Sequence, residues 1–130
     1  MIRCVSLPEG EIFGSDAEEG EDGFLPPTVR NAMYGEDCAE YFSLIEEYSI
    51  YLSSFASPYE IAVFKCYSGS DGLKIERMCR ERKDIVGVAL RDTSFYELYD
   101  DIRVVREGKY VIFIMCDAPD SLVRLARQII

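Results

Sequence analysis

Cys116 and Asp117 stand where chemistry is often found, at the junction of an apolar stretch and an expected helix start. Residues 108–116 read GKYVIFIMC and are almost wholly apolar. Ligands often sit at such strand ends, and helix N-termini bind anions. The chain contains no histidine, however, which excludes Ser-His-Asp and Cys-His mechanisms and histidine-bearing zinc sites. We therefore interpret Cys116 as a buried thiol and Asp117 mainly as a helix cap, and keep Asp117 as a candidate ligand contact.

Arg82 is the second candidate, because it interrupts an apolar helical pattern. On a helical wheel of residues 72–90, Arg82 projects from the middle of an apolar arc of about 120 degrees. A buried unpaired guanidinium would be costly, so Arg82 must reach solvent or a carboxylate. The alternative is an anchor for a ligand carboxylate or phosphate. We expect a structural partner from this set: Asp92, Glu97, Asp100, Asp101 and Asp117.

Tyrosines are numerous near the expected strand ends and in the loop that follows the long helix. The chain has nine tyrosines, seven phenylalanines and no tryptophan. Aromatic rings with a polar group suit interfaces and ligand walls, but they are also ordinary cross-strand partners in a sheet. Tyr96 and Tyr99 therefore join Arg82 and Asp117 as the candidate ligand-binding residues.

Catalytic, metal and cofactor motifs are not recognisable in the sequence. Adjacent acids such as Glu46 with Glu47 could be imagined as an acid and base pair or a cation site, but no calcium-loop spacing surrounds them. The five cysteines occur singly, without a C-x-x-C pair, which favours buried reduced thiols. We predict no catalytic residue, no metal ion and no cofactor. The sequence therefore favours a protein that is not an enzyme, without excluding an enzyme.

Charge is unevenly distributed along the chain. The net charge is −10, and residues 1–60 hold 13 acidic against 2 basic side chains, whereas residues 61–130 hold 11 against 12. This balance argues against a general nucleic-acid partner, which would need a basic surface. Residues 1–23 read as an acidic, flexible arm, either a solvated tail or a ligand for a basic partner. No apolar run is long enough to span a membrane.

Periodicity predicts the elements that must position these residues. A period of two indicates a first hairpin, and apolar spacing of 3.6 indicates a long helix after it. A second hairpin turns at Gly108, and its last strand, apolar on both faces, is typical of a central strand. The expected ranges are short helices near 27–35 and from 37, strands 48–55 and 60–67, a helix over 72–90, strands 102–107 and 109–116, and a closing helix from 117.

These elements predict one α+β domain over residues 24–130. We expect a mainly antiparallel four-stranded sheet, made of two hairpins, with helices packed on it in two layers. At 130 residues the chain has the length of a single domain with one core.

Several segments in order carry a family resemblance. They are Glu60-Ile-Ala-Val before the long helix, Arg82 within it and Gly108-Lys-Tyr-Val near the end, in a match over about residues 45–120. In these features the chain resembles the bacterial domain-of-unknown-function family numbered four three five eight, found mostly in Firmicutes. The resemblance implies no activity and no catalytic residues, but it suggests an exported, lipid-anchored protein. Cys4 lacks the preceding apolar segment that lipidation would require.

Two functions remain open on this basis. The first is a non-catalytic binding or scaffold module, of cell-envelope type if the resemblance holds, which could act as a homodimer through its aromatic sheet surface. The second is a binder of a small anionic molecule, or an enzyme, that uses Arg82, tyrosines and a carboxylate in a cleft. As written, the sequence predicts a cytoplasmic protein. If a signal segment preceded Met1, we would expect a membrane-anchored protein outside the cytoplasm.

Overall fold

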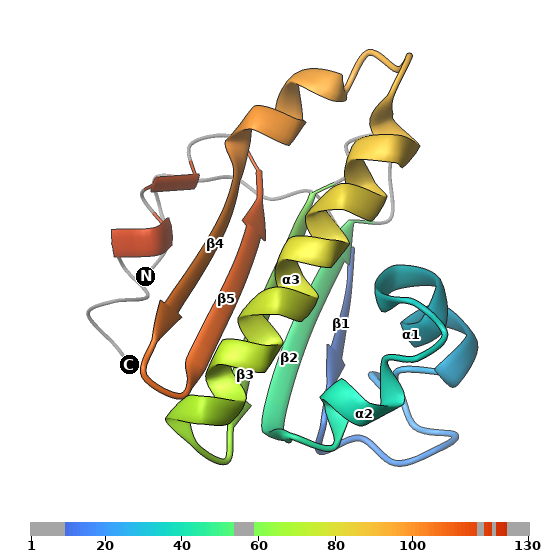
Figure 1. Ribbon diagram of the computed structural model, residues 1–130. Coiled ribbons are helices and arrows are strands. Elements are labelled where there is room, and N and C mark those ends of the chain that lie inside the picture. Colours follow the sequence, from blue (N-terminus) through green and yellow to red (C-terminus); the bar gives the residue numbers. More distant parts are fainter. Residues whose placement is uncertain (1–9, 54–58, 117–118, 121, 125–130) are drawn as a thin grey trace.

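An antiparallel sheet forms the centre of the protein, and three helices lie along one of its faces (Figure 1). The computed structural model describes residues 10–53, 59–116, 119–120 and 122–124. In chain order its elements are β1 (Gly10–Gly14), α1 (Pro27–Tyr34), α2 (Ala39–Phe42), β2 (Ile45–Ser53), β3 (Glu60–Cys66), α3 (Gly69–Leu90), the 3-10 helix η1 (Tyr96–Asp101), β4 (Ile102–Glu107) and β5 (Tyr110–Met115).

The sheet has five strands, so the expectation of four was wrong. Their order is β1-β2-β3-β5-β4, and every neighbouring pair is antiparallel. Both predicted hairpins are present, and β3 with β5 joins them. The additional strand, β1, comes from the segment expected to be an acidic arm. It forms because Phe13 is buried opposite Ile50 of β2 and contributes to the core.

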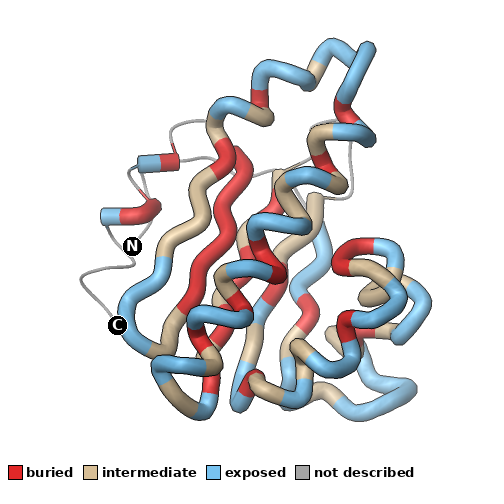
Figure 2. Tube along the Cα trace, in the orientation of Figure 1, coloured by how far each residue is buried: buried red, intermediate tan, exposed pale blue. Residues whose placement is uncertain are grey.

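The main core lies between the sheet and the helices. In β3, Ala62, Phe64 and Cys66 alternate toward the helices and are fully buried, as expected for a period of two. The apolar arc of α3 meets them through residues such as Ile75 and Met78. Figure 2 shows the buried side of α3 turned toward the strands. The α+β class predicted from the sequence is confirmed.

Strand β5 is buried on both faces, as predicted for a central strand (Figure 2). Val111 and Phe113 belong to the main core, whereas Ile112 and Ile114 belong to a smaller cluster on the opposite face. Leu122 and Val123 complete that second cluster, and they lie in residues 122–124, which are helical. Asp117, the expected cap of the closing helix, lies outside the described residues.

Turn chemistry sets the limits of the helices. The first helix begins at the prolines and ends before Gly35, as expected, while α2 begins at Ala39, two residues later than expected, with Cys38 at its N-cap position. The long helix α3 starts at Gly69, three residues earlier than expected. Its cap is Ser68, whose Oγ accepts a hydrogen bond from the backbone N–H of residue 71 at 3.1 Å. Among the described helices, none is both long and apolar enough to cross a membrane.

Candidate functional site

Arg82 forms a buried ion pair with Glu60, between α3 and β3. Its Nε donates to both Glu60 carboxylate oxygens at 3.2 and 3.1 Å, and its Nη2 donates to Oε1 at 2.5 Å. The remaining nitrogen, Nη1, donates to the Met33 carbonyl oxygen at 3.3 Å, which connects α1 to the pair. The Glu60 side chain is 2% exposed and that of Arg82 15%. The structure thus places the anomalous arginine in a charge-paired, nearly buried position.

Glu60 was not among the acids expected to pair with Arg82, so that prediction was wrong. The long helix passes over β3, and this packing brings the start of the strand under Arg82. A signal for the pair was present in the sequence. Glu60 has the same strand parity as Ala62 and Phe64, so it points inward with them. Burial of an unpaired charge is costly. The inward position of Glu60 on its strand and that of Arg82 on the apolar arc of the helix therefore indicated that the two charges pair.

The groups near the ion pair are held in their protonated forms. Burial alone would lower the pKa of Arg82, but the charge and hydrogen bonds of Glu60 raise it overall. The pKa of Tyr34 is raised, first by burial and then by the charge of Glu60. The same two causes raise the pKa of the Cys79 thiol. A guanidinium, a phenol and a thiol in this state offer no nucleophile at neutral pH.

A small hollow opens beside the ion pair. Its volume is about 240 Å³, and Glu60 and Arg82 form part of its wall. The rest of the lining is mostly apolar and comes from the last turns of α3 and the ends of three strands. We call it the ion-pair hollow, and its described lining is Leu52, Ser53, Tyr59, Glu60, Arg82, Val86, Ala89, Leu90 and Met115.

The two predicted tyrosines do not lie at this hollow. Tyr96 and Tyr99 lie in η1, and their rings stack on each other with centroids 5.9 Å apart. The ammonium group of Lys83 lies over the Tyr99 ring at 5.2 Å, so this pair of tyrosines packs against α3. Neither tyrosine is part of the described lining around Arg82. Asp117 lies outside the described residues, and of the three candidates that the structure describes only Arg82 borders the hollow.

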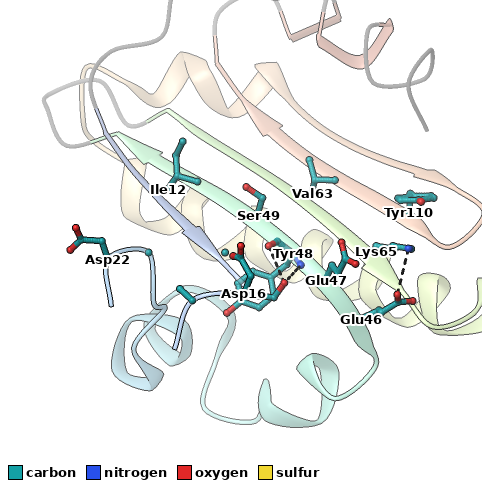
Figure 3. A pocket seen from close by; sticks show the side chains of 14 residues that line it. Ile12, Asp16, Asp22, Glu46, Glu47, Tyr48, Ser49, Val63, Lys65 and Tyr110 are labelled. Carbon is teal, nitrogen blue, oxygen red and sulfur yellow. Dashed lines mark hydrogen bonds and ion pairs between the residues drawn. The ribbon is translucent and has the colours of Figure 1, made fainter. Parts of the chain in front are cut away.

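A larger groove lies on the opposite face of the sheet. It has a volume of about 880 Å³, and it is bordered by β1, the loop that follows β1, and strands β2, β3 and β5. Ser49 and Val63 contribute to its floor. They alternate with Ile50 and Phe64 of the main core, so they point away from the helices (Figure 3). Sequence reasoning missed this groove altogether.

Carboxylates dominate the charge of the groove. Asp16 and Asp22 come from the loop after β1, and Glu46 and Glu47 from the start of β2 (Figure 3). Lys65 is the one basic side chain in the described lining, and its Nζ lies 3.4 Å from a carboxylate oxygen of Glu46. All four acids are exposed to solvent. We call this feature the acidic groove.

Apolar side chains accompany these acids. Ile12, on edge strand β1, is 64% exposed, which is high for an isoleucine in a sheet. Val63 and Tyr110 lie on the neighbouring strands and also border the groove. Figure 3 shows the three side chains spread along the same face as the carboxylates. The surface therefore offers negative charge together with apolar contact area.

Neither metal chemistry nor thiol chemistry is indicated by the described part of the chain. Within residues 10–53, 59–116, 119–120 and 122–124, no group of three acids and cysteines is arranged to hold a metal ion. Cys38, Cys66, Cys79 and Cys116 are buried and free of disulfides, as predicted for Cys66, Cys79 and Cys116. Burial, followed by the charge of Asp71, raises the pKa of Cys66 to about 11.

Comparisons with known proteins leave the function to be argued from this geometry. No family model, curated protein or solved structure matches the chain. The resemblance to the family numbered four three five eight therefore stays a prediction. Glu60 and Arg82, which form the buried ion pair, both lie in the segments on which that resemblance rests.

Proposed function

We propose that this protein is a non-catalytic binding module that holds a basic segment of a partner protein in the acidic groove. The single observation that carries the proposal is the composition of that groove. Four carboxylates surround a partly apolar floor, and the one lysine in the described lining is already paired with Glu46. Complementary charge of this kind steers a partner to a surface and fixes its orientation.

The groove also concentrates the acidity of the chain. The N-terminal half carries all of the excess negative charge, and β1, the loop after it and the start of β2 all come from that half. Two copies of the protein facing each other at this surface would bring like charges together, which is unfavourable. We therefore propose a different protein as the partner at the groove, rather than a homodimer.

The competing function, an anion binder or enzyme built on Arg82, has less support. The Nε and Nη2 atoms of Arg82 already donate hydrogen bonds to Glu60, and Nη1 donates one to a backbone carbonyl. A ligand carboxylate at Arg82 would either displace Glu60 or lie buried beside it, and in both cases one of two like charges would lack a full partner, which is strongly unfavourable. Because the pKa values of Tyr34 and Cys79 are raised, neither side chain offers a base or a nucleophile beside Arg82 at neutral pH.

The family resemblance adds a location to this proposal. If the chain is related to the family numbered four three five eight, we propose that the module acts at the cell envelope of a Firmicute. Cell fractionation of the native host, with an antibody against the protein, tests this location. Recovery in the cytoplasmic fraction alone would contradict it without affecting the groove.

A basic peptide tests the groove directly. An octapeptide of alternating lysine and valine presents lysines on one side and valines on the other when extended, and the acidic octapeptide of alternating glutamate and valine is its control. We expect the basic peptide to shift the amide signals of Ile12, Ser49 and Val63 in NMR spectra, with binding that weakens as salt is added. The acidic peptide should leave these signals unchanged.

Matched charge variants separate the groove from the overall negative charge. Glu46→Gln with Glu47→Gln removes two charges at the groove, and Asp84→Asn with Glu97→Gln removes two exposed charges elsewhere. We expect the first pair to weaken peptide binding about fivefold, because each exposed charge contributes up to about 1 kcal/mol. The control pair should change it less than about twofold, since screened distant charges contribute little. Equal weakening by both pairs would overturn the proposal.

A further inference from the structure

The ion-pair hollow combines a hydrocarbon wall with an electrically neutral polar patch. Val86, Leu90 and Met115 supply part of the wall, and Glu60 with Arg82 supplies the polar patch. Small-molecule sites in proteins have this composition, mostly apolar with a few polar groups that fix orientation. The hollow is on the helix side of the sheet, whereas the acidic groove is on the other.

Hydrogen-bonding capacity remains on both members of the pair. A guanidinium has five N–H donors, and the contacts of Arg82 to described residues use one on each of its three nitrogens. Two N–H groups are therefore left without an acceptor among the residues that the structure describes. Glu60 accepts from Arg82 alone in the same part of the chain, and a carboxylate has about four acceptor positions. A ligand group that both accepts and donates would match this patch.

Charge selects the class of ligand. Because the two charges of the pair compensate each other, an anion would be repelled by Glu60 and a cation by Arg82, and either would be buried without a full partner. A neutral group avoids both costs. The volume of about 240 Å³ is below the roughly 300–1,000 Å³ of sites that hold drug-sized molecules, so the ligand must be small.

We propose that the ion-pair hollow is a second binding site, for a small neutral molecule with an apolar body and a polar group, such as an amide, that donates and accepts hydrogen bonds. The apolar body contacts Val86, Leu90 and Met115. The polar group bridges the guanidinium of Arg82 and the carboxylate of Glu60, which stay paired. This site is independent of the acidic groove and of any partner bound there.

Three probes of nearly equal size and different charge test the site: benzamide, benzoate and benzamidine. The protein is labelled with ¹³C at its methionine methyl groups, and each probe is added while the signals are followed by NMR. All three described methionines are buried, but only Met115 belongs to the described lining of the hollow, so Met33 and Met78 serve as internal references. We expect a saturable shift of the Met115 signal with benzamide, and at least about tenfold weaker binding of the two charged probes.

Two neighbouring substitutions on α3 provide the matched control. Ala89→Leu adds bulk at the lining of the hollow, whereas Val88→Leu changes a side chain that is 66% exposed and outside the described lining. We expect Ala89→Leu to weaken benzamide binding at least about tenfold and Val88→Leu to leave it unchanged, because only the first occupies the hollow. Three outcomes would each overturn the proposal: no saturable shift of the Met115 signal, binding of benzoate as tight as that of benzamide, or an Ala89→Leu variant that binds benzamide as tightly as wild type. Binding of the basic octapeptide would be unaffected in every case.

Discussion

Replacing Arg82 by methionine removes the guanidinium while keeping much of the length of the side chain. The change leaves the Glu60 carboxylate, 2% exposed, without the group that donates three hydrogen bonds to it. Breaking a buried pair in this way costs about 3 to 5 kcal/mol. A single domain has a free energy of unfolding of about 5 to 15 kcal/mol. We therefore expect Arg82→Met to lose a large fraction of the stability.

Urea unfolding, followed by circular dichroism and tyrosine fluorescence, measures this loss. The chain has nine tyrosines and no tryptophan, so tyrosine is the natural fluorescent probe. The companion variants are Glu60→Leu and the double variant Glu60→Leu with Arg82→Met. Each single variant leaves one buried charge alone, whereas the double variant leaves none.

The double variant should therefore be more stable than the sum of the two single losses would give, by about 2 kcal/mol or more. It also keeps the test informative if a single variant fails to fold. A loss of less than about 1 kcal/mol for Arg82→Met would refute the reasoning, because the pair would then behave like an ion pair at the surface. The reasoning would also be refuted if the loss of stability in the double variant equalled the sum of the two single losses.

Three further predictions follow from other buried groups. Tyr34→Phe should leave stability unchanged or raise it by about 1 kcal/mol in urea unfolding, because the buried Tyr34 hydroxyl has no hydrogen-bond partner among the described residues; a loss above about 1 kcal/mol would contradict this. Phe13→Ala should lower the free energy of unfolding by about 3 kcal/mol, since Phe13 holds β1 to the core. Proteolysis of the variant that is slower than that of wild type would be incompatible with this role. Stability should also fall as pH rises from about 9 to about 11, because the folded protein keeps the Cys66 proton to about pH 11 whereas the unfolded chain loses it near the ordinary value of 9.0. Burial also raises the pKa of Cys79, so this thiol should contribute to the same loss of stability. In a Cys66→Ala, Cys79→Ala variant the urea midpoint should therefore fall less steeply with pH than in wild type. An unchanged dependence of the midpoint on pH would mean that other groups cause the decline.

Local pattern was enough to predict most of the elements. The alternation of Ala62, Phe64 and Cys66 indicated β3, and the apolar arc that includes Ile75 and Met78 indicated α3. These periods are properties of the chain itself, because side chains alternate in a strand and repeat every 3.6 residues in a helix. The fifth strand was missed because its pattern is too short. Only pairing with β2 and burial of Phe13 make residues 10–14 a strand.

The candidate sites could be predicted only in part. Arg82 was recognised as an anomaly that needed a partner, and the tyrosines of η1 were recognised as a group. The partner itself, Glu60, is 22 residues away in the sequence and meets Arg82 only where α3 passes over β3. The stacking of Tyr96 on Tyr99 likewise depends on η1 and on its contact with α3.

The sequence by itself determined the class of fold, the excess of acid in the N-terminal half, the lack of histidine chemistry and the need for a counter-charge at Arg82. The tertiary structure alone decided which carboxylate meets that charge, and it decided that Asp16, Glu46 and Lys65 share one groove. The physical reason is the range of the interactions. Periodicity and composition act between neighbours along the chain, whereas ion pairs and grooves arise between segments that only packing of the sheet brings together.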